Sequence, residues 1–489
     1  NYAEALKWYL KAAEQGHAYA QSKVGRMCFY GQGISKDYAK AAKWCQKASY
    51  QGIADAQNRL GYMYQNGLGV SQDYSEALKW YLKSAEQNNV SAQTYLGSMY
   101  QYGHGVQQDY AEAVRWYRKA AKQGDQTAQK RLKEQPLELF SKAMDGDSKA
   151  EYELGENYYY GRVVSQNFAE AFGWYLKAAN HGNADAQYSL GFMYARGLYV
   201  QKNDAEAVRW YLESAGHGNA NAQCNLGYMY QYGRGIEQDY SKAVEQYIKS
   251  AEQNNIPAQA NLGFMYQYGF GVQQDYAEAV RWYRKAAKQG DQTAQNRLNE
   301  QPLELFSKAM DGDPNAEYKL GENYYYGRVV SQNFAEAFGW YLKAANHGNA
   351  DAQYSLGFMY ANGQYVKQND AEAVKWYLKS VEQGNANAQF NLGYMYQYGR
   401  GIEQNYAEAV KWYRKSADQG NFQALAYLGS MYQYGFGVQQ DYAEAAKWYK
   451  KAARLGDQTA QKRLDEHPLE LFSKAIDGDP NAEYKLGDN

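Results

Sequence analysis

The sequence predicts an all-α fold, an α/α superhelix (solenoid) of 36-residue helix-turn-helix repeats. A 166-residue block recurs, because segment 98–129 returns almost unchanged at 264–295 and a third time near the C-terminal end. Within each block a Leu-Gly pair recurs every 36 residues, as at Leu96-Gly97, and the apolar residues around it follow the period of a helix. Repeats of this length stack into solenoids.

The first helix of a repeat is expected over residues 91–102 in the clearest example. Ala92, Leu96, Tyr100 and Gly103 are spaced at i, i+4, i+8 and i+11, so they lie on one side of a helix. Ala and Gly on that side allow a neighbour to come close. We therefore expect this side to be the packing face.

The second helix is expected to begin at Tyr110. Asp109 and Glu112 have the spacing of a capping box, in which the Asp side chain accepts from the free N–H groups of the first turn. All eleven Trp residues of the chain fall in the column of Trp116. A Trp at a fixed phase in each repeat is typical of a stacked core, and we interpret this column as core.

The two helices are joined by a Gly-rich turn, Gly103 to Val106 in the same repeat. A GxG turn can hold phosphate, but this one follows a helix and lacks the Lys of a nucleotide loop. A Gly after the second helix, such as Gly124, fits a left-handed helix end. Both glycine positions are interpreted as structural.

These columns give eleven full repeats and three short units of 22 residues that lack the Gly-rich loop. The short units are 125–146, 291–312 and 457–478. Pro136 opens the helix of the first one and is expected at its N1 position. A short unit at every fifth step predicts an irregular superhelix pitch. We expect 1–489 to be a single continuous solenoid, truncated at both ends because it opens without Met and stops within a repeat.

The pattern LGxxYxxGxGVxxDYxxAxxWYxKAAxxG, complete at 96–124, resembles the Sel-one-like repeat family, which is related to the tetratricopeptide repeats. The resemblance covers essentially the whole chain, with the short units as departures. It implies an α/α superhelix that acts as an adaptor for protein complexes and is not an enzyme. In bacteria it implies a protein of the envelope or a secreted one, while the sequence itself leaves the compartment open.

The charge pattern and hydropathy exclude two classes of partner. The formal net charge is −1, with acidic and basic residues interleaved, so there is no basic stripe for nucleic acid. No apolar run of 18 residues is present, so no membrane span is expected. A protein or peptide partner fits this composition, and self-association is a second alternative.

Only three cysteines occur, which excludes a disulfide-stapled scaffold. Cys28 and Cys45 replace two recurrent tyrosines within one repeat. The sequence leaves open whether they are bonded, and we favour buried free thiols.

No catalytic residue, cofactor or metal site is predicted. The six His residues have no HExxH or CxxC partners. Asp311, Asp313, Asn315, Glu317 and Glu322 have the spacing of a calcium loop, but Ala316 stands where that loop needs Gly. We therefore do not assign calcium binding.

Variation is concentrated on one side of the first helix, at positions three before, one after and five after the Gly of Leu-Gly. These positions are spaced at i, i+4 and i+8, and we call the aromatic residues there the stripe. The stripe consists of Tyr62, Tyr188, Phe192, Tyr228, Tyr232, Phe264, Tyr268, Tyr354, Phe358, Phe390, Tyr394 and Tyr398. We expect it to line a concave groove that binds a partner segment, because aromatic rings bury a large area at little entropic cost.

Three alternatives stay open. The rings could pack between repeats, the chain could be a structural spacer or self-assembling array, or stacked Tyr could hold the sugar rings of cell-wall glycan. If the stripe is a binding surface, replacing Phe390, Tyr394 and Tyr398 with Ala removes binding and leaves the melting temperature within a few degrees.

Overall fold

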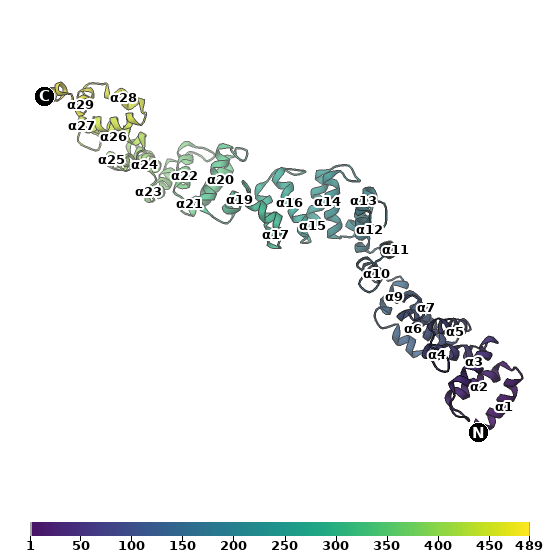
Figure 1. The fold of residues 1–489 in the computed structure, drawn as a ribbon. Helices are drawn as coiled ribbons and strands as arrows, with labels where there is room; N and C mark the ends of the chain where they lie inside the picture. Colours follow the sequence, from purple (N-terminus) through teal and green to yellow (C-terminus); the bar gives the residue numbers. More distant parts are fainter. Residues whose placement is uncertain (1, 489) are drawn as a thin grey trace. The chain divides into compact units, whose positions relative to one another are not determined.

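The computed structural model describes residues 2–488, and every regular element within them is an α-helix (Figure 1). The predicted all-α class and the repeating helix-turn-helix architecture are confirmed. The chain divides into two compact halves that meet in sequence at Asn255 and Ile256, and each half is described by itself. The single continuous domain stays a prediction.

The helices of the N-terminal half are α1 (Tyr2–Glu14), α2 (Ala18–Tyr30), α3 (Tyr38–Tyr50), α4 (Ala54–Asn66), α5 (Tyr74–Glu86), α6 (Val90–Tyr102), α7 (Tyr110–Lys122), α8 (Gln126–Arg131), α9 (Leu137–Met144), α10 (Ser148–Tyr160), α11 (Phe168–Asn180), α12 (Ala184–Arg196), α13 (Asp204–Gly216), α14 (Ala220–Tyr232) and α15 (Tyr240–Glu252). Those of the C-terminal half are α16 (Ile256–Tyr268), α17 (Tyr276–Lys288), α18 (Gln292–Leu298), α19 (Leu303–Met310), α20 (Pro314–Tyr326), α21 (Phe334–Asn346), α22 (Ala350–Asn362), α23 (Asp370–Glu382), α24 (Ala386–Tyr398), α25 (Tyr406–Asp418), α26 (Phe422–Tyr434), α27 (Tyr442–Arg454), α28 (Gln458–Leu464), α29 (Leu469–Ile476) and α30 (Pro480–Gly487).

The predicted start of the second helix is confirmed at its cap. Oδ1 of Asp109 accepts from the backbone N–H of Glu112 at 2.9 Å, and α7 begins at Tyr110. The first helix, α6, begins one residue earlier than predicted, after Asn89, whose side chain accepts from Ala92 N at 3.0 Å. Caps of this kind stabilise a helix by about 1 kcal/mol each.

The predicted place of Pro136 is wrong by one position. It stands before α9 as the N-cap residue, with φ −87°, and the helix proper begins at Leu137. Pro lacks a side-chain oxygen to cap with, so the backbone N–H of Glu138 turns back to Glu134 O instead, at 3.0 Å. The pair of short helices α8 and α9 therefore starts its second member without a side-chain cap.

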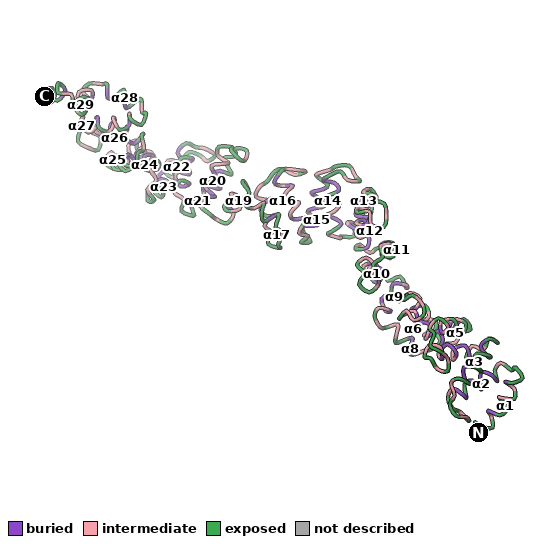
Figure 2. The backbone as a smooth tube through the Cα atoms, viewed as in Figure 1, coloured by how far each residue is buried: buried purple, intermediate pink, exposed green. Residues whose placement is uncertain are grey.

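The core of each repeat forms where the Leu-Gly pair meets the second helix. Leu96 and Met99 are fully buried, and Tyr117 is 1% exposed. Figure 2 shows buried, intermediate and exposed stretches following one another along the helices. A Cβ on Gly97 would lie 2.7 Å from Cδ1 of Tyr117, which is closer than Cβ atoms approach a ring. The Gly of each pair is therefore a contact surface for the Tyr of the second helix.

The Gly-rich turn packs against the repeat before it. Gly105 has φ 70°, and a Cβ there would lie 2.5 Å from the backbone oxygen of Tyr74, at the start of α5. The left-handed backbone and this close approach together favour Gly at position 105, whereas Tyr199 fills the same column in another repeat with φ 67°. The turn is structural, as predicted.

A buried glutamine links successive repeats, and we call this residue the Gln hub. Nε2 of Gln57 donates to Ser49 O of the preceding repeat at 3.1 Å, while its Oε1 accepts from Nε2 of Gln87 at 2.8 Å. Gln93 repeats the arrangement with Ala85 O at 3.3 Å and with Gln123 at 2.8 Å. A buried amide satisfied on both sides contributes about 1 kcal/mol per bond and fixes the register of the junction.

Cys28, Cys45 and Cys224 are buried free thiols. Burial raises the pKa of the Cys45 thiol to about 11, so it stays protonated at neutral pH. The alternative of a bond between Cys28 and Cys45 is therefore wrong in this structure, and both act as small apolar residues.

Among residues 2–488, no helix has both the length and the apolar character that a membrane crossing requires.

Candidate functional site

All twelve stripe residues lie on first helices of repeats, namely α4, α12, α14, α16, α22 and α24. Their exposure differs systematically along the helix. The position five after the Gly is the most open, with Tyr232 55% exposed, Tyr398 51% and Tyr268 44%. The stripe is therefore a graded surface and not uniformly accessible.

The position three before the Gly turns toward the second helix. Tyr188 lies 5.9 Å from the ring of Tyr211, and Phe390 lies 5.7 Å from that of Tyr413. Phe390 is only 9% exposed and belongs to the core of its repeat. For Phe390 the alternative that the rings pack within the solenoid is correct.

This burial corrects the expectation that replacing Phe390, Tyr394 and Tyr398 together would leave the melting temperature nearly unchanged. The Phe390 ring also meets Tyr427 of the next repeat edge to face, at 5.2 Å. Removing a buried Phe costs about 3–5 kcal/mol. Only Tyr394 and Tyr398, whose ring centroids are 4.5 Å apart, are suited to a test of binding.

Two hollows follow the stripe in the N-terminal half. The first, about 260 Å³, lies between α10 and α12 and is lined by Tyr152, Glu156, Tyr160, Tyr188 and Phe192 among others. The second, about 560 Å³, lies between α12 and α14 and also has Phe192 in its wall, facing Tyr228. Phe192 lines both hollows, so the stripe residues of three successive first helices border two adjacent recesses.

The first hollow contains a carboxylate among aromatic rings. The hydroxyl of Tyr175 donates to Oε1 of Glu156 at 2.7 Å. Burial, and then the bond to Glu156, raise the pKa of Tyr175 well above its usual value, so the hydroxyl remains a donor at any physiological pH. This wall offers hydrogen-bond partners and apolar surface together.

Tyr152 and Tyr160 are site residues that sequence reasoning missed. They occupy the first and last stripe positions of the repeat whose middle position is Glu156. The offsets that define the stripe place both rings in it, so the sequence carries the signal for them.

The Trp column is partly core and partly surface. Trp80 is 2% exposed and Trp210 6%, whereas Trp8 is 64% exposed. A Lys three residues later covers most of these rings, for example Lys119 with Nζ 4.0 Å from the ring centroid of Trp116. The fixed WxxK spacing was visible in the sequence, and its meaning is a recurrent cation–π contact.

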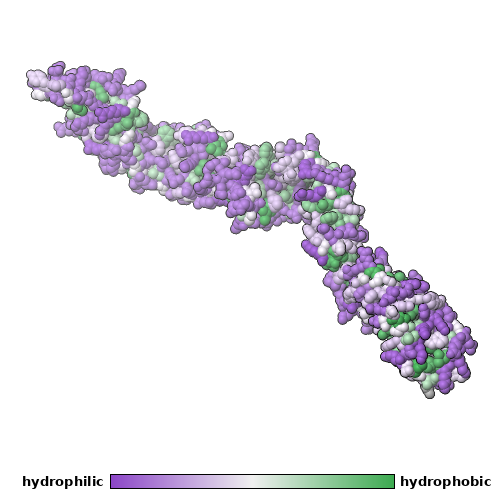
Figure 3. Space-filling view, in the orientation of Figure 1, coloured by the Kyte–Doolittle hydropathy of each residue, from purple (hydrophilic) through white to green (hydrophobic). Residues whose placement is uncertain are grey.

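Outside these patches the surface is mostly hydrophilic, and Figure 3 shows hydrophobic residues gathered in separate areas on it.

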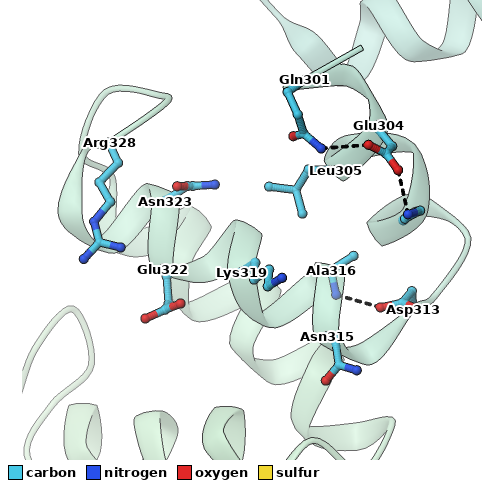
Figure 4. A pocket seen from close by; sticks show the side chains of 11 residues that line it. Gln301, Glu304, Leu305, Asp313, Asn315, Ala316, Lys319, Glu322, Asn323 and Arg328 are labelled. Atoms are coloured by element: carbon cyan, nitrogen blue, oxygen red, sulfur yellow. Dashed lines mark hydrogen bonds and ion pairs between the residues drawn. The ribbon is translucent and has the colours of Figure 1, made fainter. Parts of the chain in front are cut away.

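The residues with calcium-loop spacing contact different groups in the structure. Oδ1 of Asp313 caps α20 by accepting from Ala316 N at 2.7 Å, and Glu322 lies two and a half turns further along the helix (Figure 4). The Glu317 carboxylate is buried and meets Nδ1 of His347 at 2.7 Å. Among residues 2–488, no three His, Cys, Asp or Glu side chains converge as a metal site.

The hollow drawn in Figure 4, about 510 Å³ between α19 and α20, is polar. Glu304 in its wall accepts from Nε2 of Gln301 at 2.9 Å and from Nζ of Lys308 at 2.7 Å. Glu304 and Lys308 therefore form an ion pair in its wall, and the Asp313 carboxylate caps α20.

Comparison with protein families finds the Sel1 repeat along the chain. It matches residues 1–17, 18–53, 54–89, 90–125, 148–183, 184–219, 220–255, 256–291, 314–349, 350–385, 386–421 and 422–457.

Two solved structures are similar in sequence over most of their lengths. The first is c5321, described as a protective antigen present in uropathogenic Escherichia coli strains and displaying an SLR fold, with 33% identity over 99% of this chain and 97% of that one, and a TM-score of 0.30. The second is a Sel1 repeat protein from Oxalobacter formigenes, with 30% identity over 67% of this chain and 89% of that one, and a TM-score of 0.30. No functionally curated protein matches the chain.

Proposed function

The chain belongs to the Sel1 repeat family, and we propose that it uses the exposed part of its stripe to capture a segment of another protein. The repeat architecture is in general that of a non-catalytic scaffold for protein–protein interaction. The proposal adds two points to this general role: the stripe is the binding surface, and a segment of another protein is what it binds.

One observation carries the proposal: partly exposed rings succeed one another from repeat to repeat. Tyr394 contacts Tyr427 of the next repeat at 6.2 Å, and Tyr62 contacts Tyr95 at 5.9 Å. Exposed rings that continue across repeat junctions form an apolar track with hydroxyl groups along it. Such a surface favours an extended or helical segment, because each ring buries much area and loses few rotamers.

The test uses the intact chain and a variant that keeps every fully buried core residue. Tyr394→Ser with Tyr398→Ser removes two rings from α24, one half-buried and one 51% exposed. Leu378→Ser on α23 is the matched control, since this aliphatic side chain is 37% exposed and lies on the second helix. Proteins captured from the native source are identified by mass spectrometry, then purified and titrated against all three chains.

We expect at least one purified partner to bind the native and control chains and to lose at least tenfold in affinity for the stripe variant. If every partner binds all three chains equally, the stripe is not the binding surface and a spacer or another face is favoured. Binding to glycan in place of protein, lost in the stripe variant, would assign the same rings to sugar recognition.

A further inference from the structure

The recess between α12 and α14 carries a positive charge that the rest of the stripe lacks. Three cationic side chains, Arg196, Lys202 and Arg234, line this hollow of about 560 Å³ beside Phe192 and Tyr228. In the other repeats with a Leu-Gly pair, the stripe positions hold aromatic, small, amide or acidic residues. The charge is therefore a local property of one site.

Among the described residues, Arg234 is the one of these three cations that an ion pair neutralises. Nη2 of Arg234 donates to the two carboxylate oxygens of Asp204, at 3.1 and 3.2 Å. The guanidinium of Arg196 lies 5.5 Å from the ring centroid of Phe192. Among residues 2–488, neither Arg196 nor Lys202 has an ion-pair partner, so two positive charges border the recess without compensation.

Lys202 also departs from a structural column. The equivalent residue in most repeats is a Gln that closes the end of the first helix, as Gln108 does by donating to Gln101 O at 2.7 Å and Gln238 by donating to Gln231 O at 2.7 Å. Lys202 makes no such bond to Ala195. An ammonium group at the recess has replaced a recurrent structural hydrogen bond.

The C-terminal half repeats the wall residues of this recess without the two unpaired charges. Phe358, Tyr377, Asn391, Tyr394 and Met395 stand 166 residues after the corresponding wall residues of the first recess. The ion pair is kept as well, because Arg400 Nη2 contacts Asp370 Oδ1 at 2.7 Å. Arg196 and Lys202, however, are replaced by Asn362 and Gln368.

The chain therefore presents one wall chemistry twice, once with two extra positive charges. We propose that the α12–α14 recess binds a peptide segment in which an Asp or Glu side chain lies beside an aromatic or aliphatic one. This inference rests on the proposed function and specifies the chemistry of the captured segment. The carboxylate meets Arg196 and Lys202, while the apolar side chain packs on Phe192 and Tyr228.

The recess in the C-terminal half takes a neutral segment of the same shape. Asn362 and Gln368 offer amide groups to it and no net charge, and Arg400 is already occupied by Asp370. The two halves then differ in specificity through two side chains on a shared frame.

The experiment selects random 12-residue peptides, displayed on phage, on the intact chain. The same selection is run on Arg196→Asn with Lys202→Gln, which gives the first recess the residues of the second. Lys130→Gln with Lys133→Gln is the control of equal charge, because both side chains are exposed and lie outside the recess. Each selected peptide is synthesised in two versions, one with its own Asp and Glu residues and one with each of them replaced by Asn or Gln. Binding of both versions to each chain is measured by fluorescence anisotropy.

We expect peptides selected on the native and control chains to be enriched in Asp and Glu next to an apolar residue. Their affinity should fall about five- to thirtyfold in the recess variant, and also when salt is raised from about 0.1 to 0.5 M. The amide versions should bind all chains alike. Asn362→Arg with Gln368→Lys should create a second site that binds acidic peptides.

Two other outcomes overturn the inference in distinguishable ways. If selected peptides bind Tyr228→Ser or Tyr394→Ser more weakly than the native chain but are not enriched in Asp or Glu, the proposal about charge is wrong and the proposed function is kept. If no selected peptide depends on either ring, the proposed function is wrong and the inference falls with it.

Discussion

Phe390 and Tyr398 share one helix and one stripe, and replacing each by Ala should have opposite consequences. The Phe390 ring is 9% exposed and touches two neighbouring rings, whereas Tyr398 is 51% exposed. Phe390→Ala leaves a cavity beside Tyr413, which costs about 3–5 kcal/mol for a buried Phe. Tyr398→Ala removes little buried area and should change stability by less than about 0.5 kcal/mol.

The effect is local, because each repeat of a solenoid contacts only its neighbours. Hydrogen exchange followed by mass spectrometry over residues 386–434 therefore measures it better than a single melting curve. A loss of about 3–5 kcal/mol raises the opening equilibrium of α24 and α26 by about two to three and a half powers of ten. Exchange in α20, four helices away, serves as the internal control.

Equal loss of protection in the two variants would refute the graded reading of the stripe. Unchanged protection in Phe390→Ala would do the same, since the ring would then have no structural role.

Three further outcomes follow from the packing. Gly97→Ala should destabilise the chain by about 1–3 kcal/mol in urea unfolding, because the new Cβ would lie 2.7 Å from the Tyr117 ring. His181→Ala should lower the free energy of unfolding by about 1–3 kcal/mol, since it leaves the Glu151 carboxylate, 3% exposed, without its contact at 2.7 Å. The double variant Glu151→Gln with His181→Gln should restore stability, because it rebuilds a Gln hub. Burial raises the pKa of Tyr117 to about 12, above the unfolded value of about 10, so its contribution is complete below about pH 10 and is lost as the pH rises toward 12. Urea titrations between about pH 10 and 12 should show that the free energy of unfolding falls less steeply with pH in Tyr117→Phe than in the native chain. The two slopes should differ by up to about 1.4 kcal/mol per pH unit, and identical slopes would contradict the assignment.

Periodicity and capping were sufficient to predict the helices. The bounds of α6 and α7 follow from Asn89, Asp109 and the Gly after each helix, because these residues act on the backbone beside them. Such local signals survive any arrangement of the repeats. Pro136 was misplaced because its position depends on the turn before it.

The positions of the stripe could be predicted from the sequence, but the burial of each of its rings could not. Whether a ring at i, i+4 or i+8 is open depends on how the next repeat lies over it, which no single repeat encodes. Phe390 is covered by Tyr427, a residue 37 positions later. Arg196 stands at a stripe position that the sequence identifies, but Lys202 lies in the loop after α12, and the spacing of the stripe does not place it beside the same hollow.

The Gln hub has a consequence for how such a chain changes length over generations. Its bond to the preceding repeat goes to a main-chain carbonyl, as from Gln57 to Ser49 O, and any helix in that place offers the same acceptor. A repeat copied by unequal recombination therefore finds its partner atom wherever it is inserted, without a matching mutation in its neighbour. The first repeat after α9 breaks this interchangeability, because Glu151 has only acceptors to offer and relies on His181. Glu317 at the matching place in the C-terminal half, and Leu425 in α26, break it as well, so the junctions open to copying are those that keep the Gln.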